Sequence, residues 1–199
     1  SSPQKTLNLP IKETPQIPWD DLEQWISPLD FGGNPDDEVD DTDAIQKAID
    51  AGKTTVYLPN GIWVVEGRLI LRGSVQRFIG CEAEFEGNGS MEIADGVSGT
   101  VVFERFMKGY GSNFKIKINN SRTTILSSCI LGHVDSIGSG EVFIDDICGD
   151  SFRFSNQKVW ARQWNSEPPV TKITNDGGTM WILGLKTERE GTLIHTLNG

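Results

Sequence analysis

Hydrophobic residues follow a helical period in one short segment near the N-terminus. Apolar side chains recur there at i, i+1, i+4 and i+5, which places Ala44, Ile45, Ala48 and Ile49 on one face of a helix. Asp40, Asp41 or Thr42 can supply the N-cap, and Gly52 follows as the C-terminal stop. The pattern predicts a helix near residues 41–51, a strand over residues 54–59 and a tight turn at Asn60-Gly61.

Beyond Gly67 the helical period disappears and short apolar bursts take its place. Most bursts are three to six residues long and are separated by Gly, Asn, Asp or Ser, which is typical of short strands joined by turns. Comparable places recur at intervals of 17, 17 and 22 residues, at Ile125, Val142, Val159 and Trp181. A loose repeat of about 20 residues made of strands alone predicts a solenoid of roughly seven to nine coils.

A β-sandwich is the competing all-β architecture. Sandwich strands usually alternate apolar and polar side chains and are joined by hairpins. Residues 114–119 (FKIKIN) alternate in this way, whereas residues 123–132 (TTILSSCILG) and 181–185 (WILGL) do not. A helix that covers the first coil also suits a solenoid, because that coil would otherwise expose an unpaired apolar edge.

The capping segment carries a family resemblance. Residues 30–63 read DFGGNPDDEVDDTDAIQKAIDAGKTTVYLPNGIW. The matching positions are Phe31-Gly32, Asp40-Asp41-Thr42, Ala44-Ile45-Gln46, Ala48-Ile49-Asp50 and Val56-Tyr57-Leu58-Pro59 with Gly61. Through them the chain resembles the pectate-lyase-like proteins of the rhamnogalacturonase and polygalacturonase-like group. The resemblance implies an all-β fold, a right-handed parallel β-helix (solenoid) with an N-terminal capping α-helix.

Two segments follow from this interpretation. Residues 1–18 contain four prolines and little periodicity, so we expect an extended N-terminal arm. Residues 19–199 are expected to form a single β-helix domain. The last residues, GTLIHTLNG, read as a strand and a turn with no capping helix after them. We therefore expect a truncated or uncapped C-terminus, belonging to a larger parent chain or covered by another subunit of a homo-oligomer.

The resemblance implies an extracellular or periplasmic (secreted) protein that binds or cleaves a polysaccharide. The hydrolase motifs of that group are not intact: Asp145-Asp146, His133 in GHV and Asn175-Asp176 in TND stand in the wrong order, and no Arg-Ile-Lys follows. A non-catalytic structural or adhesive β-helix, such as a surface-layer, fibre or tailspike-like module, is therefore the alternative. The sequence leaves open whether the chain is a polysaccharide lyase, a glycoside hydrolase or no enzyme.

One group of charged residues is a candidate lyase site. Arg153, Lys158 and Arg162 form a compact basic group, and Asp145 and Asp146 lie one short coil earlier. Lyases of the similar family use calcium or a cationic side chain to acidify the proton and Arg or Lys as the base, and such a base needs burial or cationic neighbours. The alternative is that these side chains are solvated charges on the outside of the coils.

Three tryptophans are candidate carbohydrate-binding residues. Trp160 and Trp164 stand four residues apart in VWARQW, which places them on the same face of a strand. Trp181 follows one coil later. If that face points outward, the rings form a platform for sugars; if it points inward, they fill the core.

An acidic cluster precedes the predicted helix. Asp36, Asp37, Glu38, Asp40 and Asp41 place five carboxylates within six residues. Calcium prefers such oxygen ligands, so Asp36, Asp37, Asp40 and Asp41 are candidate metal ligands, although the spacing lacks the D-x-D-x-D-G loop. The alternative, which we favour, is helix capping and a favourable interaction with the helix dipole, with no cofactor required.

Composition restricts the partners. The net charge is −10, which disfavours nucleic acid because phosphate binding needs clustered Lys and Arg. No apolar run is long enough to span a bilayer.

Cys81, Cys129 and Cys148 include no CxxC motif, and their odd number argues against a disulfide framework or a zinc site. We expect buried free thiols and a glycan as the partner.

Overall fold

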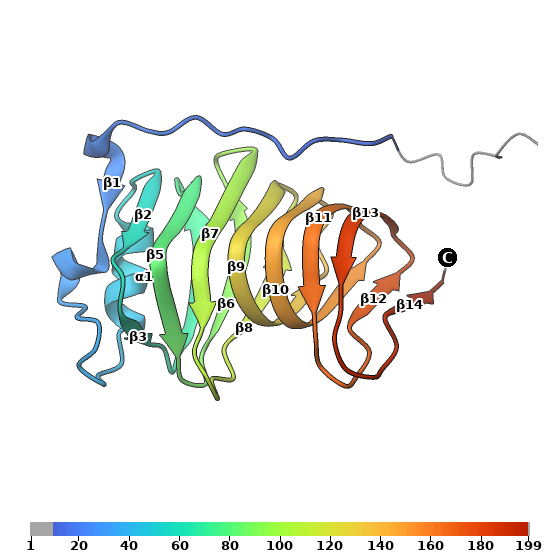
Figure 1. Ribbon diagram of the computed structural model, residues 1–199. Coiled ribbons are helices and arrows are strands. Elements are labelled where there is room, and N and C mark those ends of the chain that lie inside the picture. Colours follow the sequence, from blue (N-terminus) through green and yellow to red (C-terminus); the bar gives the residue numbers. More distant parts are fainter. Residues whose placement is uncertain (1–9, 199) are drawn as a thin grey trace, which may run out of the picture.

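The computed structural model describes residues 10–198 and is a right-handed parallel β-solenoid of about seven turns (Figure 1). Strands on the near side of Figure 1 run in one direction, strands behind them run in the other, and the chain advances along the axis with each coil. All strand pairs in the described part of the chain are parallel. The predicted fold class is confirmed, and the sandwich is excluded.

The described chain contains two short 3-10 helices, one α-helix and fourteen strands. The helical elements are η1 (Leu22–Gln24), η2 (Pro28–Phe31) and α1 (Thr42–Asp50). The strands are β1 (Trp25–Ile26), β2 (Thr55–Leu58), β3 (Ile62–Val64), β4 (Arg68–Gly73), β5 (Arg77–Glu86), β6 (Ser90–Gly96), β7 (Thr100–Lys108), β8 (Lys115–Asn119), β9 (Thr123–Ser136), β10 (Val142–Ser155), β11 (Lys158–Ser166), β12 (Ile173–Asp176), β13 (Thr179–Lys186) and β14 (Ile194–Leu197). No helix in this part of the chain is long and apolar enough to cross a bilayer.

The coils stack into faces that run along the axis. The front sheet contains β2 and the first halves of β5, β7, β9, β10, β11 and β13, paired in that order. The rear sheet contains β4, β6 and β8, the last parts of β9 and β10, and then β12 and β14. The middle parts of the long strands β9 and β10 join the two sheets. Each of these strands therefore bends as it passes from the front face to the rear face.

Residues with left-handed backbone angles form the corner where the front sheet ends. Aligned corner positions in successive coils have positive φ: Arg105 (62°), Ser128 (50°), Asp146 (57°), Gln163 (51°) and Gly184 (78°). A single residue in this conformation interrupts the in–out alternation of a strand. Side-chain direction therefore cannot be counted through a corner by twos.

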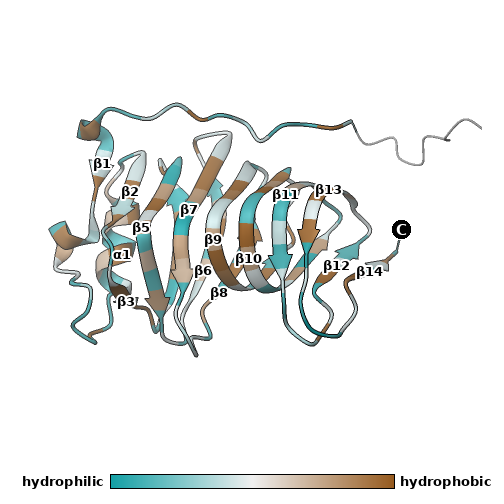
Figure 2. Ribbon diagram, in the orientation of Figure 1, coloured by the Kyte–Doolittle hydropathy of each residue, from teal (hydrophilic) through white to brown (hydrophobic). Residues whose placement is uncertain are grey.

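The interior is filled by columns of similar side chains. Phe78 stacks on Phe103 with ring centroids 5.7 Å apart, and Phe85 stacks on Phe106 at 5.0 Å and on Phe114 at 4.7 Å. In Figure 2, hydrophobic and hydrophilic positions alternate along the front strands, and the apolar members of that alternation line the core. Burial of these continuous apolar columns holds each coil to its neighbours.

The predicted capping helix is present, with slightly shorter bounds. In α1 the side chains of Ala44, Ile45, Ala48 and Ile49 are buried, and the helix packs against β4 and η2. The Asn60-Gly61 turn is not a hairpin, because β2 and β3 both pair with β5 in parallel. It is a corner that moves the chain from the front sheet to the next face.

The predicted repeat is out of register at two of its four places. One inward row contains Thr124, Val142, Val159 and Met180. The neighbouring outward row contains Ile125, Phe143, Trp160 and Trp181. The pattern of bursts mixed members of the two rows, because both are apolar and adjacent in sequence.

Candidate functional site

Residues 10–18, the part of the predicted arm that lies within the described residues, run along the outside of the front sheet (Figure 1). We call this segment the arm. Its contacts with the sheet are Lys12 Nζ to Glu141 (2.5 Å), Glu13 to Arg162 (2.7 Å), Trp160 Nε1 donating to the Pro10 carbonyl (2.9 Å) and Arg77 Nη2 donating to the Ile17 carbonyl (2.8 Å). The arm is thus held by polar contacts distributed along its length.

The arm lies over an apolar row on the outer surface of the sheet. This row consists of Val102, Ile125, Phe143 and Trp160, with Ile17 of the arm and Trp181 packed against it. Phe143 and Trp160 stack with their ring centroids 5.2 Å apart, and Trp160 is only 2% exposed. Without the arm, water would contact an aromatic row on the outer face of the solenoid.

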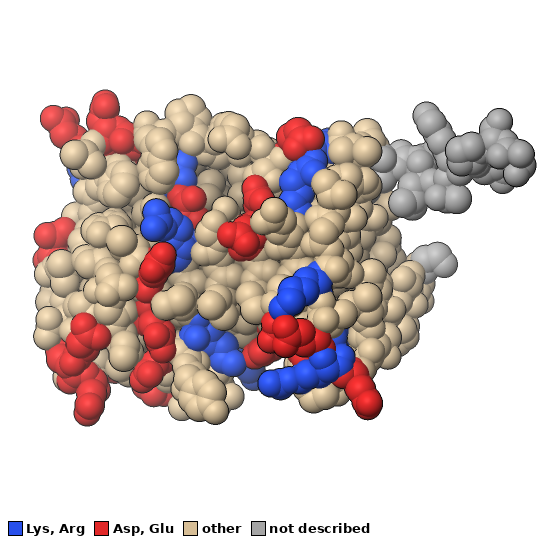
Figure 3. Space-filling model, in the orientation of Figure 1, with Lys and Arg blue, Asp and Glu red and all other residues tan. Residues whose placement is uncertain are grey.

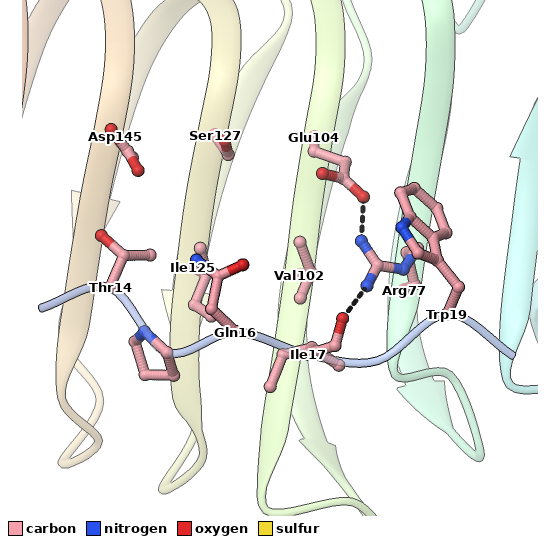
Figure 4. A pocket seen from close by; sticks show the side chains of 11 residues that line it. Thr14, Gln16, Ile17, Trp19, Arg77, Val102, Glu104, Ile125, Ser127 and Asp145 are labelled. Atoms are coloured by element: carbon pink, nitrogen blue, oxygen red, sulfur yellow. Dashed lines mark hydrogen bonds and ion pairs between the residues drawn. The ribbon is translucent and has the colours of Figure 1, made fainter.

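A polar row runs beside the arm. Glu104, Ser127, Asp145 and Arg162 align in register on β7, β9, β10 and β11. Figure 4 shows Glu104, Ser127 and Asp145 on one side of the arm's path and the apolar Val102 and Ile125 beneath it. The arm and three members of the polar row, Glu104, Ser127 and Asp145, line a cleft of about 170 Å³, which we call the front cleft; Arg162 continues the row beyond that lining. Acidic and basic side chains are interspersed over this face (Figure 3).

A tryptophan–arginine pair lies at each end of the polar row. The Arg77 guanidinium lies 4.0 Å from the ring centroid of Trp19 and forms an ion pair with Glu104. At the other end, the Arg162 guanidinium lies 4.7 Å from the ring centroid of Trp181. Such cation–π contacts orient both the ring and the guanidinium. From β5 to β13 there are five strand spacings, or about 24 Å, so the surface suits an extended ligand.

Comparison with known families identifies the first half of the solenoid. Residues 25–120 match a family described as rhamnogalacturonase A/epimerase, pectate lyase-like. The pectate-lyase-like resemblance is confirmed. The match includes α1, Arg77 and Glu104, whereas Ser127, Asp145 and Arg162 lie beyond it. The chain is therefore a carbohydrate-related β-helix protein. No curated protein and no solved structure matches it.

The chain does not bring the five predicted catalytic residues into one group. Asp145 and Arg162 are neighbours in register on the front sheet, and Lys158 is exposed at the start of β11. Arg153 lies on the rear sheet and pairs with Asp176. Asp146 occupies the left-handed corner, where it borders a different depression beside Arg105 and Ser128. The corner separates side chains that are close in sequence.

The prediction that Trp160 and Trp164 share a face is wrong. Trp160 points outward beneath the arm, while Trp164 is fully buried in the interior and meets Phe152 edge-on at 4.8 Å. Gln163 lies between them with φ of 51°, so the strand turns a corner and its alternation shifts. Trp160 aligns instead with Trp181.

The acidic cluster forms hydrogen bonds that close its own loop. Asp36 accepts from the Ile62 backbone N–H (2.9 Å), and Asp40 accepts from the N–H groups of Thr42 (3.0 Å) and Glu66 (3.2 Å). These bonds tie the loop before α1 to the first coil. The N-cap residue of α1, Asp41, makes no capping hydrogen bond with its side chain, so these carboxylates act as loop-closing acceptors before the helix.

Asp37 and Asp41 differ in their surroundings. Hydrogen bonds from Val39 and Asn34 lower the pKa of Asp37, whereas burial raises the pKa of Asp41. Across residues 10–198, no three His, Cys, Asp or Glu side chains are grouped so as to hold a metal ion. Calcium ligation by Asp36, Asp37, Asp40 and Asp41 stays a prediction.

Sequence reasoning missed Arg77, Glu104 and Trp19 as members of the site. Glu104 lies 23 residues before Ser127, and Asp145 and Arg162 follow at 18 and 17. A register aligned on these polar positions would have placed them in one row. Nothing in the sequence indicated that Trp19 lies on Arg77, because that contact depends on the path of the arm.

Proposed function

We propose that this pectate-lyase-like β-helix binds a polysaccharide that lies along the front cleft, outside the cytoplasm. The supporting observation is the polar row with a tryptophan–arginine pair at each end. Sugars bind through apolar ring faces on aromatic side chains and through hydroxyls on fixed polar groups. The family match supports a carbohydrate as the ligand and an extracellular or periplasmic location.

Binding fits the geometry better than hydrolysis does. Glu104 and Asp145 are two strand spacings apart, or about 9.5 Å, at the upper end of the range for the two carboxyl groups of inverting glycosidases. One of that pair must donate a proton. Glu104 is engaged by Arg77, and Asp145 has Arg162 as its neighbour on the next strand. Both environments suit carboxylates that accept hydrogen bonds from sugar hydroxyls.

Affinity electrophoresis in gels that contain neutral or acidic polysaccharides tests the proposal. Retardation of the full chain by at least one polysaccharide is expected. Trp181→Ala and Asp145→Ala should each weaken that retardation about tenfold, because each removes about 1–2 kcal/mol of contact. Leu22→Ala is the matched control, because Leu22 is 78% exposed at the N-terminal end of the solenoid and belongs neither to the cleft lining nor to the tryptophan–arginine pairs. Its retardation should equal that of the wild type.

The same samples separate the competing functions. New reducing ends, or absorbance from an unsaturated product, that disappear in Asp145→Ala would establish cleavage in the front cleft. Absence of retardation by every polysaccharide, together with self-assembly in light scattering, would support the structural or adhesive alternative and overturn the proposal.

A further inference from the structure

A second groove lies on the rear sheet, which faces away from the arm. Its lining includes Arg68 of β4, Glu92 of β6, Lys115 and Lys117 of β8, and His133 and Asp135 of β9, and its volume is about 470 Å³. We call it the rear groove. Lys115 aligns with His133 and Lys117 aligns with Asp135. The side chains therefore form two short rows that run along the solenoid axis.

Two of the basic side chains in the rear groove have no partner. Arg68 pairs with Glu92, which also accepts a hydrogen bond from Asn119 Nδ2 at 2.9 Å. Within residues 10–198, Lys115 Nζ and Lys117 Nζ make no ion pair and no hydrogen bond. The two lysines are two residues apart on one strand, so both point to the same face. Lys117 lies in register between Glu92 and Asp135, whereas Lys115 lies between Ser90 and His133. Lys115 therefore has no carboxylate beside it on either neighbouring strand.

The neighbours of the lysines supply hydrogen-bonding groups for an uncharged part of a ligand. His133 Nδ1 lies 2.8 Å from Ser151 Oγ, which fixes the ring and leaves Nε2 for another contact. Asp135 Oδ1 is buried without a hydrogen-bond partner in the described chain. No aromatic side chain lines the groove, so base stacking, on which single-stranded nucleic acid depends, has no platform there.

We propose that the rear groove is a second glycan-binding site that takes a sugar unit bearing a carboxylate or a sulfate. The unpaired ammonium groups of Lys115 and Lys117 bind the anionic group, and His133 and Asp135 contact the hydroxyls. Charge-assisted hydrogen bonds of this kind are the strong ones in a water-exposed groove. The site is separate from the front cleft. It selects a sugar by its negative charge, whereas the front cleft selects a sugar whose apolar ring face stacks on tryptophan.

Proton NMR of the full chain tests the proposal, because the protein has two histidines, His133 and His195. Titration with an oligouronide or a sulfated oligosaccharide should shift the imidazole signals of His133 and leave those of His195 unchanged. His133→Gln assigns the signals. Uncharged oligosaccharides of the same length should produce no shift at His133. The comparison of the two charged probes identifies which anion the groove prefers.

Charge variants provide the second measurement. Lys115→Gln/Lys117→Gln should weaken binding of the anionic probe about tenfold by calorimetry and reduce its salt dependence. Lys47→Gln/Lys53→Gln removes the same charge from the α1 end and should change binding less than about twofold. Equal losses in both double variants, or no shift at His133 with either charged probe, would overturn the proposal. Trp181→Ala should not affect binding of the anionic probe to the rear groove. This variant therefore separates failure of the rear-groove proposal from failure of the front-cleft proposal.

Discussion

The cysteine thiols show how far two identical side chains differ at the scale of single residues. Cys81 is exposed, whereas Cys129 is buried among the phenylalanines of the core. Burial raises the pKa of Cys129 to about 12. The expectation of buried thiols is therefore right for Cys129 and wrong for Cys81, and Cys148 is half-buried. The reactive species of a cysteine is the thiolate, so enclosure and the raised pKa both make Cys129 unreactive.

A thiol-labelling experiment follows from this difference. At pH 8 in native buffer, Cys81 should react within minutes with a disulfide reagent, and Cys129 should stay unlabelled because it is both enclosed and neutral. Peptide mass spectrometry would locate the label. In denaturant both should react. Labelling of Cys129 at the rate of Cys81 in the native protein would contradict the packing described for β9.

Single corner residues determine which face a side chain occupies at the scale of one strand. Gln163 is exposed and has φ of 51°, a region that β-branched residues avoid. The aligned position in the next coil is Gly184, which adopts this conformation without strain. The corner thus requires a left-handed backbone at this position, and a residue with a Cβ such as Gln163 adopts it with some conformational strain.

Substitutions at Gln163 should separate backbone strain from side-chain contacts. Gln163→Val should lower the free energy of unfolding by about 1–2 kcal/mol, because a branched Cβ is crowded at positive φ. Gln163→Asn, which tolerates this region, is the control and should change it by less than about 0.5 kcal/mol. Urea unfolding measures both. Equal stability of the Val and Asn variants would argue against a left-handed corner.

The N-terminus of α1 provides a pH-dependent test at the scale of one helix. Partial burial of Asp40 opposes its pKa shift, but hydrogen bonds from Thr42 and Glu66 outweigh it and lower the pKa. A carboxyl whose pKa is lowered on folding stabilises the protein above its unfolded pKa, and that contribution is lost as the pH falls through the folded pKa.

Asp40→Ala should therefore lower the free energy of unfolding by about 1 kcal/mol at pH 7, and by less as the pH falls below about 4. Urea unfolding at a series of pH values measures the difference. Asp43→Ala removes a carboxylate from the same helical turn, whose side chain accepts no hydrogen bond in the described structure, and should show a smaller deficit. A deficit for Asp40→Ala that grows on acidification would contradict the role of the Asp40 carboxylate as acceptor for Thr42 and Glu66.

Stability is distributed unevenly over the whole molecule. A central strand such as β9 pairs with a strand of the coil before it and a strand of the coil after it. The arm between Pro10 and Pro18, by contrast, makes no backbone–backbone hydrogen bond with other described residues. Solenoids are held by contacts between neighbouring coils. Regions with few buried contacts open most readily.

Hydrogen exchange should therefore follow position in the stack. Amides of β7, β9 and β10 should exchange slowest, and those of residues 11–17 should exchange within seconds at neutral pH. A ligand in the front cleft should slow the arm, since the arm forms one wall of it. Mass spectrometry after brief labelling reads both effects. Protection of the arm equal to that of β9 would show that it is a fixed part of the sheet.

The sequence alone determined the features that depend on neighbouring residues. Helix α1 could be predicted because its apolar face, its caps and its stop lie within about a dozen residues. Short bursts after Gly67 predicted strands, and their recurrence predicted a solenoid. The capping segment also carried the family resemblance, which the match over residues 25–120 bears out.

Tertiary structure alone decided which side chains meet. The register between coils depends on apolar residues about 20 positions apart stacking in the interior, and a shift of one residue exchanges the inward and outward faces. Left-handed corners at non-glycine residues such as Gln163 leave no signal in the sequence. The front cleft also needs the arm to cross four coils. Contacts between distant segments set these features. Local sequence patterns could therefore indicate some residues of the front cleft but not how those residues are arranged.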